Sequence, residues 1–383
     1  MKKALIVTGY KYPDGDAGAV RQHSFAKILE ALDFSVTVVS LGECTGFEVR
    51  DNDGIKYISL RYDGSGVSVK IKNRLNYIKN FKAFIEKNGI PQIIMVAEVD
   101  FFVLLFLKKY AQKHKIKLLY DSVEWYSPEE FKCGRLSPQY IINNRLNTKW
   151  LRDSFSVVSI SSYLENHFNS IGVESERVPV ILDICSTPSN KRTLSQKTVF
   201  LYAGSPGRND YISVIIKAFS LLPTGFHDMW ELRFAGINKE QLVSLCGADK
   251  IDVEKIDKSV VCFGRIGRDE VLNQLSQADF TVLMRPQDAI YSKAGFPTKV
   301  VESMATATPV IANITSDLGL YLKDGKNSLT VNSCLAEELA KVLEKALTLT
   351  SDEKKQMCQN ARMTAEKYFD YRNYLKIMEK LIG

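Results

Sequence analysis

The sequence contains no hydrophobic run that is long enough to span a bilayer. Its most apolar stretch, FFVLLFL at 101–107, lies between Asp100 and Lys108, whereas a transmembrane helix needs roughly 20 residues. This stretch predicts a buried helix. The apolar run of the N-terminal MKKALIVTGY stops at Gly9, which is too short for the core of a signal peptide. We therefore expect no export signal and a cytoplasmic protein.

Recognisable metal and cofactor motifs are also missing. The seven cysteines are scattered, without a CxxC pair or a Cys/His cluster of zinc-like spacing, and this favours inert thiols in a reducing compartment. The DND at 51–53 has the aspartate spacing of metal-dependent sugar transferases, but Gly54 follows it and favours a hairpin turn. There is no P-loop, and no GxGxxG follows the first predicted strand. We expect neither a metal nor another cofactor.

Length and charge bound the remaining possibilities. The 383 residues suggest two domains, and 45% hydrophobic with 25% charged residues is ordinary for a globular protein. The 51 basic residues exceed the 44 acidic ones and give a net charge of +7. This excess indicates an anionic partner without choosing among a nucleotide, a membrane and nucleic acid. The motifs described below favour a nucleotide and a membrane, and we expect no nucleic acid partner.

Short apolar runs alternate with helix-period segments along the whole chain. Strands are predicted in the first half at 3–10, 35–41, 90–98, 116–122 and 155–161, and in the second half at 198–204, 231–236, 259–266, 280–286 and 309–312. This is the pattern of βαβ units, which form parallel sheets covered by helices. The polar segment 184–197 is the best candidate linker. We predict an α/β protein with two Rossmann-like, doubly wound domains that face a central cleft.

The stretch KAGFPTKVVESMATATPVIA at 293–312 predicts an anion site. Pro297 excludes an interior helix position, so Thr298 is expected to be the N-cap of a helix that starts at Lys299. A phosphate can then bind the free N–H groups at the helix start, with Lys299 and Lys293 as cations. Glu302, one turn later, can accept hydrogen bonds from the two hydroxyls of a ribose. Alternatively, Glu302 only complements the helix dipole.

In each half of the chain, one glycine-containing turn follows the first predicted strand. In AGSPGRNDY at 203–211, glycines permit a close approach of the backbone to a ligand, and Arg208 could bind a phosphate through two nitrogens. In PDGDAGAVR at 13–21, Gly18 precedes a helix that carries Arg21 and His23. Both stretches are equally compatible with plain strand-to-helix turns. His23 is expected to pack or cap rather than to act as a catalyst.

Two further stretches suggest an acceptor and a membrane. YDSVEWY at 120–126 places Asp121 and Glu124 beside aromatic residues at the end of a predicted strand, which suits a sugar, although a polar loop with a buried Trp fits as well. The helix predicted at 70–87 has six basic residues and one acidic residue. It either contacts anionic lipid or covers the sheet with a solvated basic face.

Together these stretches resemble the retaining glycosyltransferases of the GT-B fold, in particular the large family 4 group that uses nucleotide sugars. The resemblance is strongest in LYAGSPGRND, FAGIN, CFGRIGRDEVLNQLSQADFTVLMRP and GFPTKVVESMATATPVIA. It implies an acceptor-binding domain at 1–185, a donor-binding domain at 195–368, and a final helix at about 369–383 that packs back on the first domain. It also implies a UDP- or GDP-linked donor, a glycan or lipid-linked acceptor, and a role in cell-surface polysaccharide or glycolipid synthesis of the bacterial type.

The resemblance assigns roles to individual residues. Glu302 resembles the second glutamate of an E-x(7)-E motif, but Ala294 stands at the place of the first, and Tyr120 precedes Asp121 where the family often has histidine. We expect Arg208, Lys293 and Lys299 to neutralise the leaving diphosphate. The expected donor-binding residues are Gly18, Gly204, Gly207, Gly295, Phe296, Thr298, Glu302 and Arg265, and the expected acceptor-side residues are Arg21, Asp121 and Glu124.

Two other functions remain open from the sequence. A nicotinamide-dependent oxidoreductase would also use Rossmann-like halves, and Glu43 follows the second strand as its ribose ligand would. A noncatalytic module that binds a nucleotide sugar would explain Ala294 in place of a glutamate. Detection of sugar transfer, of bound nucleotide alone, or of nicotinamide chemistry would separate the three.

Overall fold

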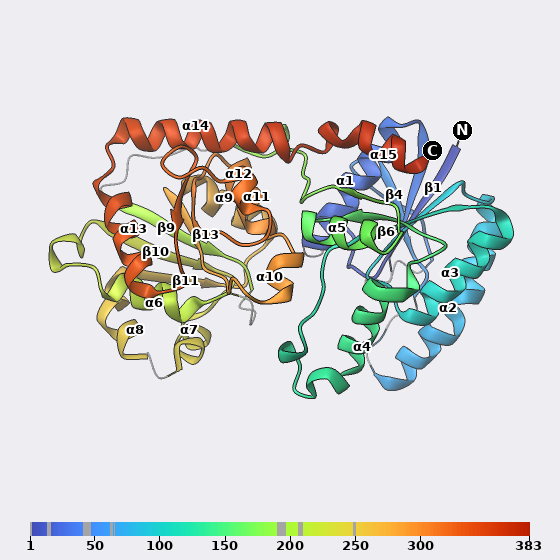
Figure 1. Ribbon diagram of the computed structural model, residues 1–383, viewed down its shortest axis with the longest axis horizontal. Helices are drawn as coiled ribbons and strands as arrows, with labels where there is room; N and C mark the ends of the chain where they lie inside the picture. The colour runs from blue at the N-terminus through green and yellow to red at the C-terminus, as the bar shows by residue number, and fades with distance from the viewer. Residues whose placement is uncertain are drawn as a thin grey trace. The chain divides into compact units, whose positions relative to one another are not determined.

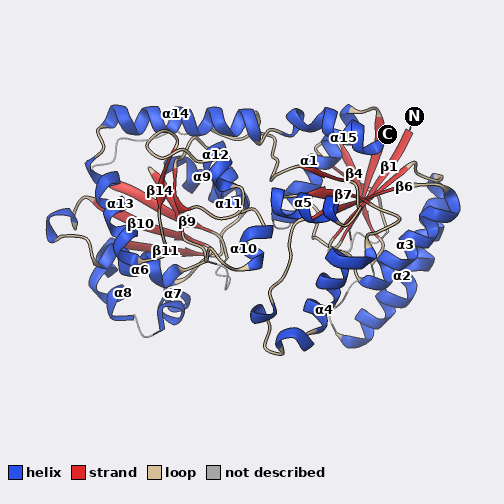
Figure 2. Cartoon of the chain, viewed as in Figure 1, coloured by secondary structure: helices blue, strands red, loops and turns tan. Residues whose placement is uncertain are grey.

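The computed structural model describes residues 2–13, 17–40, 47–61, 64, 66–189, 197–205, 210–247 and 250–383. The chain forms two compact units. The first unit comprises Met1–Leu182 and Tyr371–Gly383, and the second comprises Asp183–Asp370. Each unit has strands inside and helices outside, as Figure 2 shows. The predicted α/β class with two parallel-sheet domains is confirmed.

The described strands of the first unit form one sheet in the order β3-β4-β2-β1-β5-β6-β7-β8. Their bounds are β1 Lys2–Thr8, β2 Phe34–Ser40, β3 Arg50–Asn52, β4 Ile55–Ser59, β5 Ile93–Ala97, β6 Lys117–Ser122, β7 Ser156–Ser159 and β8 Ser175–Arg177. All neighbours are parallel except β3 and β4, which form the hairpin predicted at DND. Asp51 accepts the Gly54 N–H at 3.0 Å in its turn.

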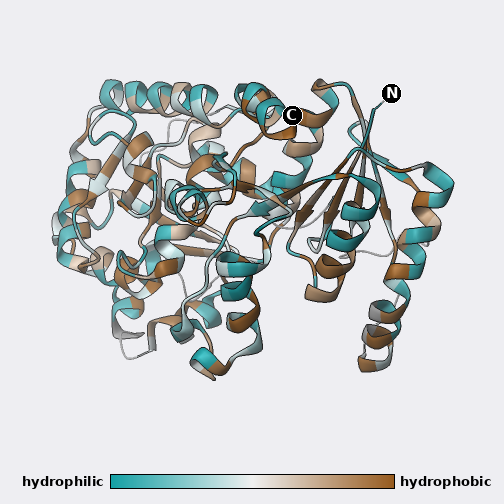
Figure 3. Ribbon diagram, turned by 45° about the vertical axis from the view of Figure 1, so that its right-hand side comes forward, coloured by the Kyte–Doolittle hydropathy of each residue, from teal (hydrophilic) through white to brown (hydrophobic). Residues whose placement is uncertain are grey.

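Helices cover the sheet of the first unit (Figure 1). They are α1 Ala17–Ala31, α2 Val67–Asn88, α3 Phe101–His114, α4 Pro138–Arg145, α5 Ser162–Ser170 and α15 Leu375–Ile382. The strands are brown in Figure 3, whereas the helices alternate brown and teal, because each helix buries one face only. In α3, the predicted helix at 101–107 is confirmed, but Phe102 remains 56% exposed while Leu104 and Leu107 are buried.

Helix α15 belongs to the first unit although it follows the second unit in the chain. Met378 and Leu381 of α15 are fully buried in the same hydrophobic cluster as Ile28 of α1 and Ile6 of β1. Helix α15 thus contributes side chains to the hydrophobic core of the first unit. None of the helices in the described part of the chain is long and apolar enough to cross a membrane.

The described strands of the second unit are all parallel, in the order β11-β10-β9-β12-β13-β14. Their bounds are β9 Thr198–Ala203, β10 Trp230–Ala235, β11 Val260–Gly264, β12 Phe280–Leu283, β13 Val310–Asn313 and β14 Ser328–Val331. The helices are α6 Ile212–Ser220, α7 Lys239–Cys246, α8 Lys250–Ile256, α9 Arg268–Gln277, α10 Ile290–Ala294, α11 Thr298–Ala305, α12 Leu318–Tyr321, α13 Ala336–Thr348 and α14 Ser351–Tyr368.

An aromatic cluster joins the end of α14 to the loop before α11. Phe369 is fully buried, and its ring centroid lies 4.9 Å from that of Tyr321 and 5.9 Å from that of Phe296. Aromatic rings at these distances gain contact energy beyond the burial of their area. The cluster therefore fixes the segment that leads into α11.

Phe369→Ala tests this cluster. Truncation of a buried Phe leaves a cavity, and we expect the free energy of unfolding of the second unit to fall by about 3–5 kcal/mol. Met363→Ala is the matched control, because Met363 lies on α14 but is 54% exposed. Calorimetry of both variants measures the effect. Equal stability of the two variants would contradict a structural role for Phe369.

Candidate functional site

The sheet of the second unit has a switch point between β9 and β12. From central β9 the chain continues through β10 and β11 on one side, and β12, β13 and β14 lie on the other side. In open α/β sheets, ligands bind outside the carboxyl ends of the strands at such a point, because the connections diverge there. The side chains that follow β9 and β12 are therefore the first candidates for a binding site.

The loop after β9 passes close to helix α11. Gly204 has a φ of 146°, a conformation that side chains rarely adopt, and a Cβ at this position would overlap the Cε of Lys299. After the loop, the Tyr211 N–H donates to the carbonyl of Met284 beyond β12 at 2.8 Å. This bond holds Asp210 beside the end of β12. Gly207 and Arg208, both expected to bind the donor, lie outside the described residues.

Helix α11 begins one residue earlier than the sequence predicts. Pro297 is the N-cap, Thr298 is the first helical residue, and no side chain caps the helix. The prediction of Thr298 as the N-cap is wrong, because Pro297 already has the extended conformation of a cap, with φ of −75° and ψ of 111°. The N–H groups of the first turn are thus left without a side-chain acceptor at this position, as an anion site requires.

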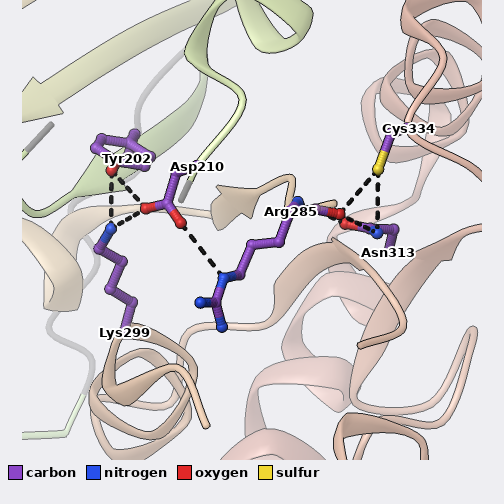
Figure 4. Close-up of polar contacts among 6 residues, drawn as sticks. All are labelled: Tyr202, Asp210, Arg285, Lys299, Asn313 and Cys334. Atoms are coloured by element: carbon purple, nitrogen blue, oxygen red, sulfur yellow. Dashed lines mark hydrogen bonds and ion pairs between the residues drawn. The ribbon is translucent and has the colours of Figure 1, made fainter. Parts of the chain in front are cut away.

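Lys299 lies in a polar cluster with two residues from the β9 side. Its ammonium donates to the Tyr202 hydroxyl at 2.8 Å and to the carboxylate of Asp210, as Figure 4 shows. The Tyr202 hydroxyl in turn donates to Asp210 Oδ2 at 2.7 Å. Burial lowers the pKa of Lys299, and the neighbouring Asp210 carboxylate opposes this effect. The lysine predicted to bind phosphate therefore already has an internal partner.

Arg285, which the sequence analysis did not select, completes the cluster. Its side chain is 10% exposed, and its Nε lies 3.6 Å from Asp210 Oδ1. The Asn313 side chain fixes its backbone, accepting the Arg285 N–H at 2.9 Å and donating to the Arg285 carbonyl at 2.7 Å. The Cys334 thiol donates to the same carbonyl at 2.9 Å (Figure 4). The guanidinium is thus held at the switch point by a rigid backbone.

Glu302 lies one turn along α11 and is paired with Arg268 at the start of α9. Arg268 Nη1 donates to Glu302 Oε1 at 2.6 Å, and the carboxylate is 14% exposed. Arg265, which the sequence predicts to bind the donor, lies in the loop before α9 and is exposed, whereas Arg268 of α9 makes the contact. A carboxylate that is oriented by a guanidinium at one oxygen can present its other oxygen to a hydroxyl.

Residues 187–364 match the family described as glycosyl transferases group 1. This match covers slightly less than half of the chain and lies within the second unit. The resemblance drawn from the sequence is thereby confirmed. No curated protein matches the chain by sequence.

Solved structures show that the whole chain has the GT-B fold. Sucrose-phosphate synthase from Thermosynechococcus elongatus is 14% identical, with a TM-score of 0.76 over 100% of this chain and 98% of that one. A glycosyltransferase from Rickettsia africae is 15% identical, with a TM-score of 0.72 over 100% and 97%. HepE from Anabaena, solved in complex with UDP-glucose, is 13% identical, with a TM-score of 0.68 over 98% of both chains.

Other residues of the second unit that were expected to bind the donor do not share one surface. Lys293 of α10 is exposed, whereas Ala294 is fully buried, so the place of the family's first glutamate faces the core. The Gly295 N–H donates to the Tyr291 carbonyl at 2.9 Å. The ring of Phe296 is only 6% exposed and packs in the aromatic cluster. The ring of Phe296 is therefore not available to a donor, which corrects the expectation for its side chain.

The first and last residues of the second unit lie close to each other. Their carboxylates and a nearby thiol lie within 4.8 Å of one another: Asp183, Cys185 and Asp370. Asp370 Oδ2 accepts the Ile184 N–H at 3.2 Å and the Cys185 thiol at 3.9 Å. Hydrogen bonds within the group thus account for its arrangement. This group was not selected from the sequence.

In the first unit, Arg21 and Asp121 pair with each other rather than line a sugar surface. Arg21 Nη2 and Nε donate to Asp121 at 2.9 and 3.0 Å, and their side chains are 3% and 0% exposed. Gln22 donates to the second carboxylate oxygen at 2.7 Å, and Arg21 also donates to the Val178 carbonyl at 2.9 Å. The expectation of an acceptor contact is corrected, because both charges are enclosed in the core.

The surroundings of three further residues selected from the sequence, all in the first unit, are as follows. Glu124 is exposed, while the neighbouring Trp125 indole donates to Asn144 Oδ1 at 3.2 Å. A Cβ on Gly18 of α1 would overlap the ring of Tyr10, so this glycine permits close packing within the unit. His23 Nδ1 lies 2.7 Å from the Tyr12 hydroxyl, in agreement with a packing role.

Asp121→Asn tests the role of the buried pair. Loss of the carboxylate charge leaves the Arg21 guanidinium enclosed without a counter-charge, and we expect a loss of about 3–5 kcal/mol in the free energy of unfolding. Glu129→Gln, at an exposed carboxylate eight residues away, is the control and should change stability by less than about 0.5 kcal/mol. Urea denaturation measures both. If Asp121→Asn were as stable as the wild type but had lost sugar transfer, the pair would instead have a role in binding the acceptor.

Proposed function

We propose that the protein is a retaining glycosyltransferase that moves a sugar from a UDP- or GDP-linked donor to an acceptor hydroxyl. The observation that carries this proposal is the arrangement at the switch point of the second sheet. There, the uncapped start of α11, the cations Lys299 and Arg285, and the carboxylate Glu302 lie along one edge, within the segment that matches the group 1 glycosyltransferases.

The proposed donor binding follows from the chemistry of these groups. The diphosphate binds the free N–H groups at the start of α11 and the nearby cations. Glu302 accepts hydrogen bonds from the ribose hydroxyls with the oxygen that Arg268 does not bind. Lys293 is exposed, whereas Lys299 and Arg285 both lie beside Asp210, so these two residues are better candidates for the cations that bind the diphosphate. Arg208 is retained as a proposal from the sequence.

The proposed reaction uses charge stabilisation without a metal. As the bond between the anomeric carbon and the phosphate oxygen breaks, positive charge develops on the sugar and negative charge on the leaving diphosphate. Fixed cations at the leaving oxygen lower this barrier electrostatically. The acceptor oxygen attacks from the face that the diphosphate leaves and retains the configuration. Its proton passes to the departing phosphate.

A nucleotide panel with Glu302→Gln tests the donor site. Ligand at 100 times its dissociation constant stabilises a protein by about 2.7 kcal/mol, so UDP or GDP should raise the melting temperature of the wild type. Because a charged hydrogen bond contributes about 1.5–3 kcal/mol, Glu302→Gln should bind the same nucleotide roughly 10- to 100-fold more weakly. Titration calorimetry with each nucleotide measures the dissociation constants.

Glu240→Gln provides the matched control, since Glu240 is an exposed carboxylate on α7 of the same unit. It should bind nucleotide as the wild type does. Equal affinity of Glu302→Gln and the wild type would remove Glu302 from the ribose site. A wild type that binds no nucleotide would refute the proposed function as a whole.

A second candidate, a noncatalytic module that binds nucleotide sugar, is favoured by one observation. Ala294 is fully buried where the family's first glutamate would orient the transferred sugar. Incubation with UDP- and GDP-sugars distinguishes the two functions, because release of free nucleoside diphosphate by hydrolysis or transfer excludes the noncatalytic module.

The proposal includes peripheral contact with a membrane through α2. Val67, Ile71 and Leu75 repeat every fourth residue and are 75%, 53% and 74% exposed, whereas Tyr77 and Phe81 of the same helix are buried. A helix that buries one apolar face and exposes a second one is typical of a surface that enters a bilayer.

The charge of α2 supports the same contact. The same helix carries exposed lysines at Lys72, Lys79, Lys82 and Lys87. Basic residues near an anionic leaflet each contribute about 1 kcal/mol of attraction. A lipid-linked glycan is therefore the acceptor that fits best, and this agrees with a role in cell-surface polysaccharide or glycolipid synthesis at the inner face of the membrane.

Charge reversal at Lys72, Lys79 and Lys82 tests the membrane contact. Replacement of all three by Glu should weaken binding to phosphatidylglycerol vesicles by more than about 100-fold, because three attractive charges become repulsive. Vesicle sedimentation at low and high salt measures the binding.

The control is the same reversal in the second unit, at the exposed Lys239, Lys258 and Lys341. It changes the net charge equally and should leave sedimentation close to that of the wild type. If both triple variants lose binding alike, net charge explains the attraction and α2 is not the contact. If neither does, the protein does not use these lysines to bind lipid.

A further inference from the structure

Two cations share one carboxylate at the switch point of the second unit. Asp210 accepts from the Tyr202 hydroxyl and from the Lys299 ammonium, and its other oxygen faces Arg285 (Figure 4). The carboxylate is 7% exposed. The other nearby carboxylate, Glu302, is paired with Arg268, so among the described residues this half-buried group has an excess of one positive charge. Such an excess in a partly desolvated site attracts a further anion.

Arg285 is the incompletely satisfied member of the group. Its Nε is buried and has no hydrogen-bond acceptor among the described residues, and the Asp210 oxygen at 3.6 Å is too far to serve as one. A buried guanidinium nitrogen without an acceptor is costly. The Asn313 side chain binds both the N–H and the carbonyl of Arg285. The backbone of Arg285 is therefore fixed and does not shift to bring its Nε closer to an acceptor.

Asp210 is placed where an anion of the donor would be. It lies between the ammonium of Lys299, in the first turn of α11, and the guanidinium at the end of β12. The Tyr211–Met284 hydrogen bond fixes its distance from the Arg285 segment. In this arrangement the carboxylate makes the contacts that a phosphate group would otherwise make, but with a single charge and an imperfect fit to Arg285.

We propose that Asp210 is an internal counter-ion that holds Lys299 and Arg285 in the absence of ligand and competes with the diphosphate of the donor for them. This inference rests on the proposed function and adds Arg285 and Asp210 to it. The diphosphate binds Arg285 directly, whereas Asp210 is a positioning residue. After sugar transfer, the carboxylate returns to the two cations and promotes release of the nucleoside diphosphate.

Asp210→Asn tests the competition. Without the competing charge, UDP or GDP should bind about 10-fold more tightly than to the wild type. The gain should also appear with inorganic diphosphate and be absent with uridine or guanosine, which have no phosphate. If diphosphate release limits turnover, KM and kcat should both fall. Unchanged or weaker binding of nucleotide and inorganic diphosphate by a folded Asp210→Asn protein would overturn the inference.

Asp252→Asn is the control for a general loss of an ion pair. Asp252 accepts from Lys255 and from Ser220 at 3.0 Å in the same unit, and its side chain is 16% exposed. Its substitution should leave the dissociation constant of the nucleotide unchanged. A tenfold gain in this control as well would assign the effect to net charge and overturn the role of Asp210.

Arg285→Gln tests the inference independently of the folding of the Asp210 variant. It should weaken UDP or GDP binding by about 10-fold, and the double variant should lose the gain of Asp210→Asn. Unchanged affinity of Arg285→Gln would overturn the inference while leaving the proposed function intact. A wild type that binds neither nucleotide nor inorganic diphosphate would overturn both.

The pH dependence of binding provides a second readout. The charged or titratable groups that face Lys299 are Asp210 and Tyr202 from the β9 side, Arg285 from the segment after β12 and Glu302 from α11 itself. Asp210 supports the protonated ammonium against the lowering of its pKa by burial. In Asp210→Asn, nucleotide affinity should therefore decline at a lower pH than in the wild type as the solution becomes alkaline. Superimposable profiles would contradict the assigned role.

Discussion

The ion pair between Lys299 and Asp210 imposes the main constraint on the second unit. A half-buried ammonium is stabilised by a carboxylate within reach, and this contact connects segments that are far apart in the chain. The ion pair places Lys299 of α11 against the loop after β9. A side chain at position 204 would overlap Lys299, so this close approach requires glycine there. The ion pair also draws that loop toward the end of β12, where the Tyr211 N–H completes the link. The edge of the sheet at which a ligand would bind is thereby organised around one pair of charges.

The principal strands were predictable because they are apolar and flanked by helix-period segments. β5 is buried at all five positions, and β9 at all six, so the sequence pattern is strong. β8 and β14 were not predicted. Ser175–Arg177 consists of polar residues at the edge of its sheet, and Ser328–Val331 is a short edge strand with two polar residues. Edge strands are stabilised by backbone pairing with one neighbour, which leaves little hydrophobic pattern in the sequence.

The candidate site was only partly predictable for a different reason. Lys299 and Glu302 lie in a stretch whose proline and helix start are visible in the sequence. Their partners are not, since Asp210 and Arg268 are 89 and 34 residues away, and local pattern contains no information on such pairs. Arg285 did have a signal, because it lies near the carboxyl end of the strand predicted at 280–286. The pairing of Arg21 with Asp121, 100 residues apart, was missed for the same reason as the others.

The position of α15 has a consequence for how the protein is made. The first unit contains Met1–Leu182 and Tyr371–Gly383, and between them the chain contains the whole second unit. During synthesis, therefore, the second unit can bury its own core while the first still lacks Met378 and Leu381. The unit that begins first is completed last. Until then, the apolar surface of α1 and β1 that α15 covers is exposed to water, to chaperones and to other nascent chains.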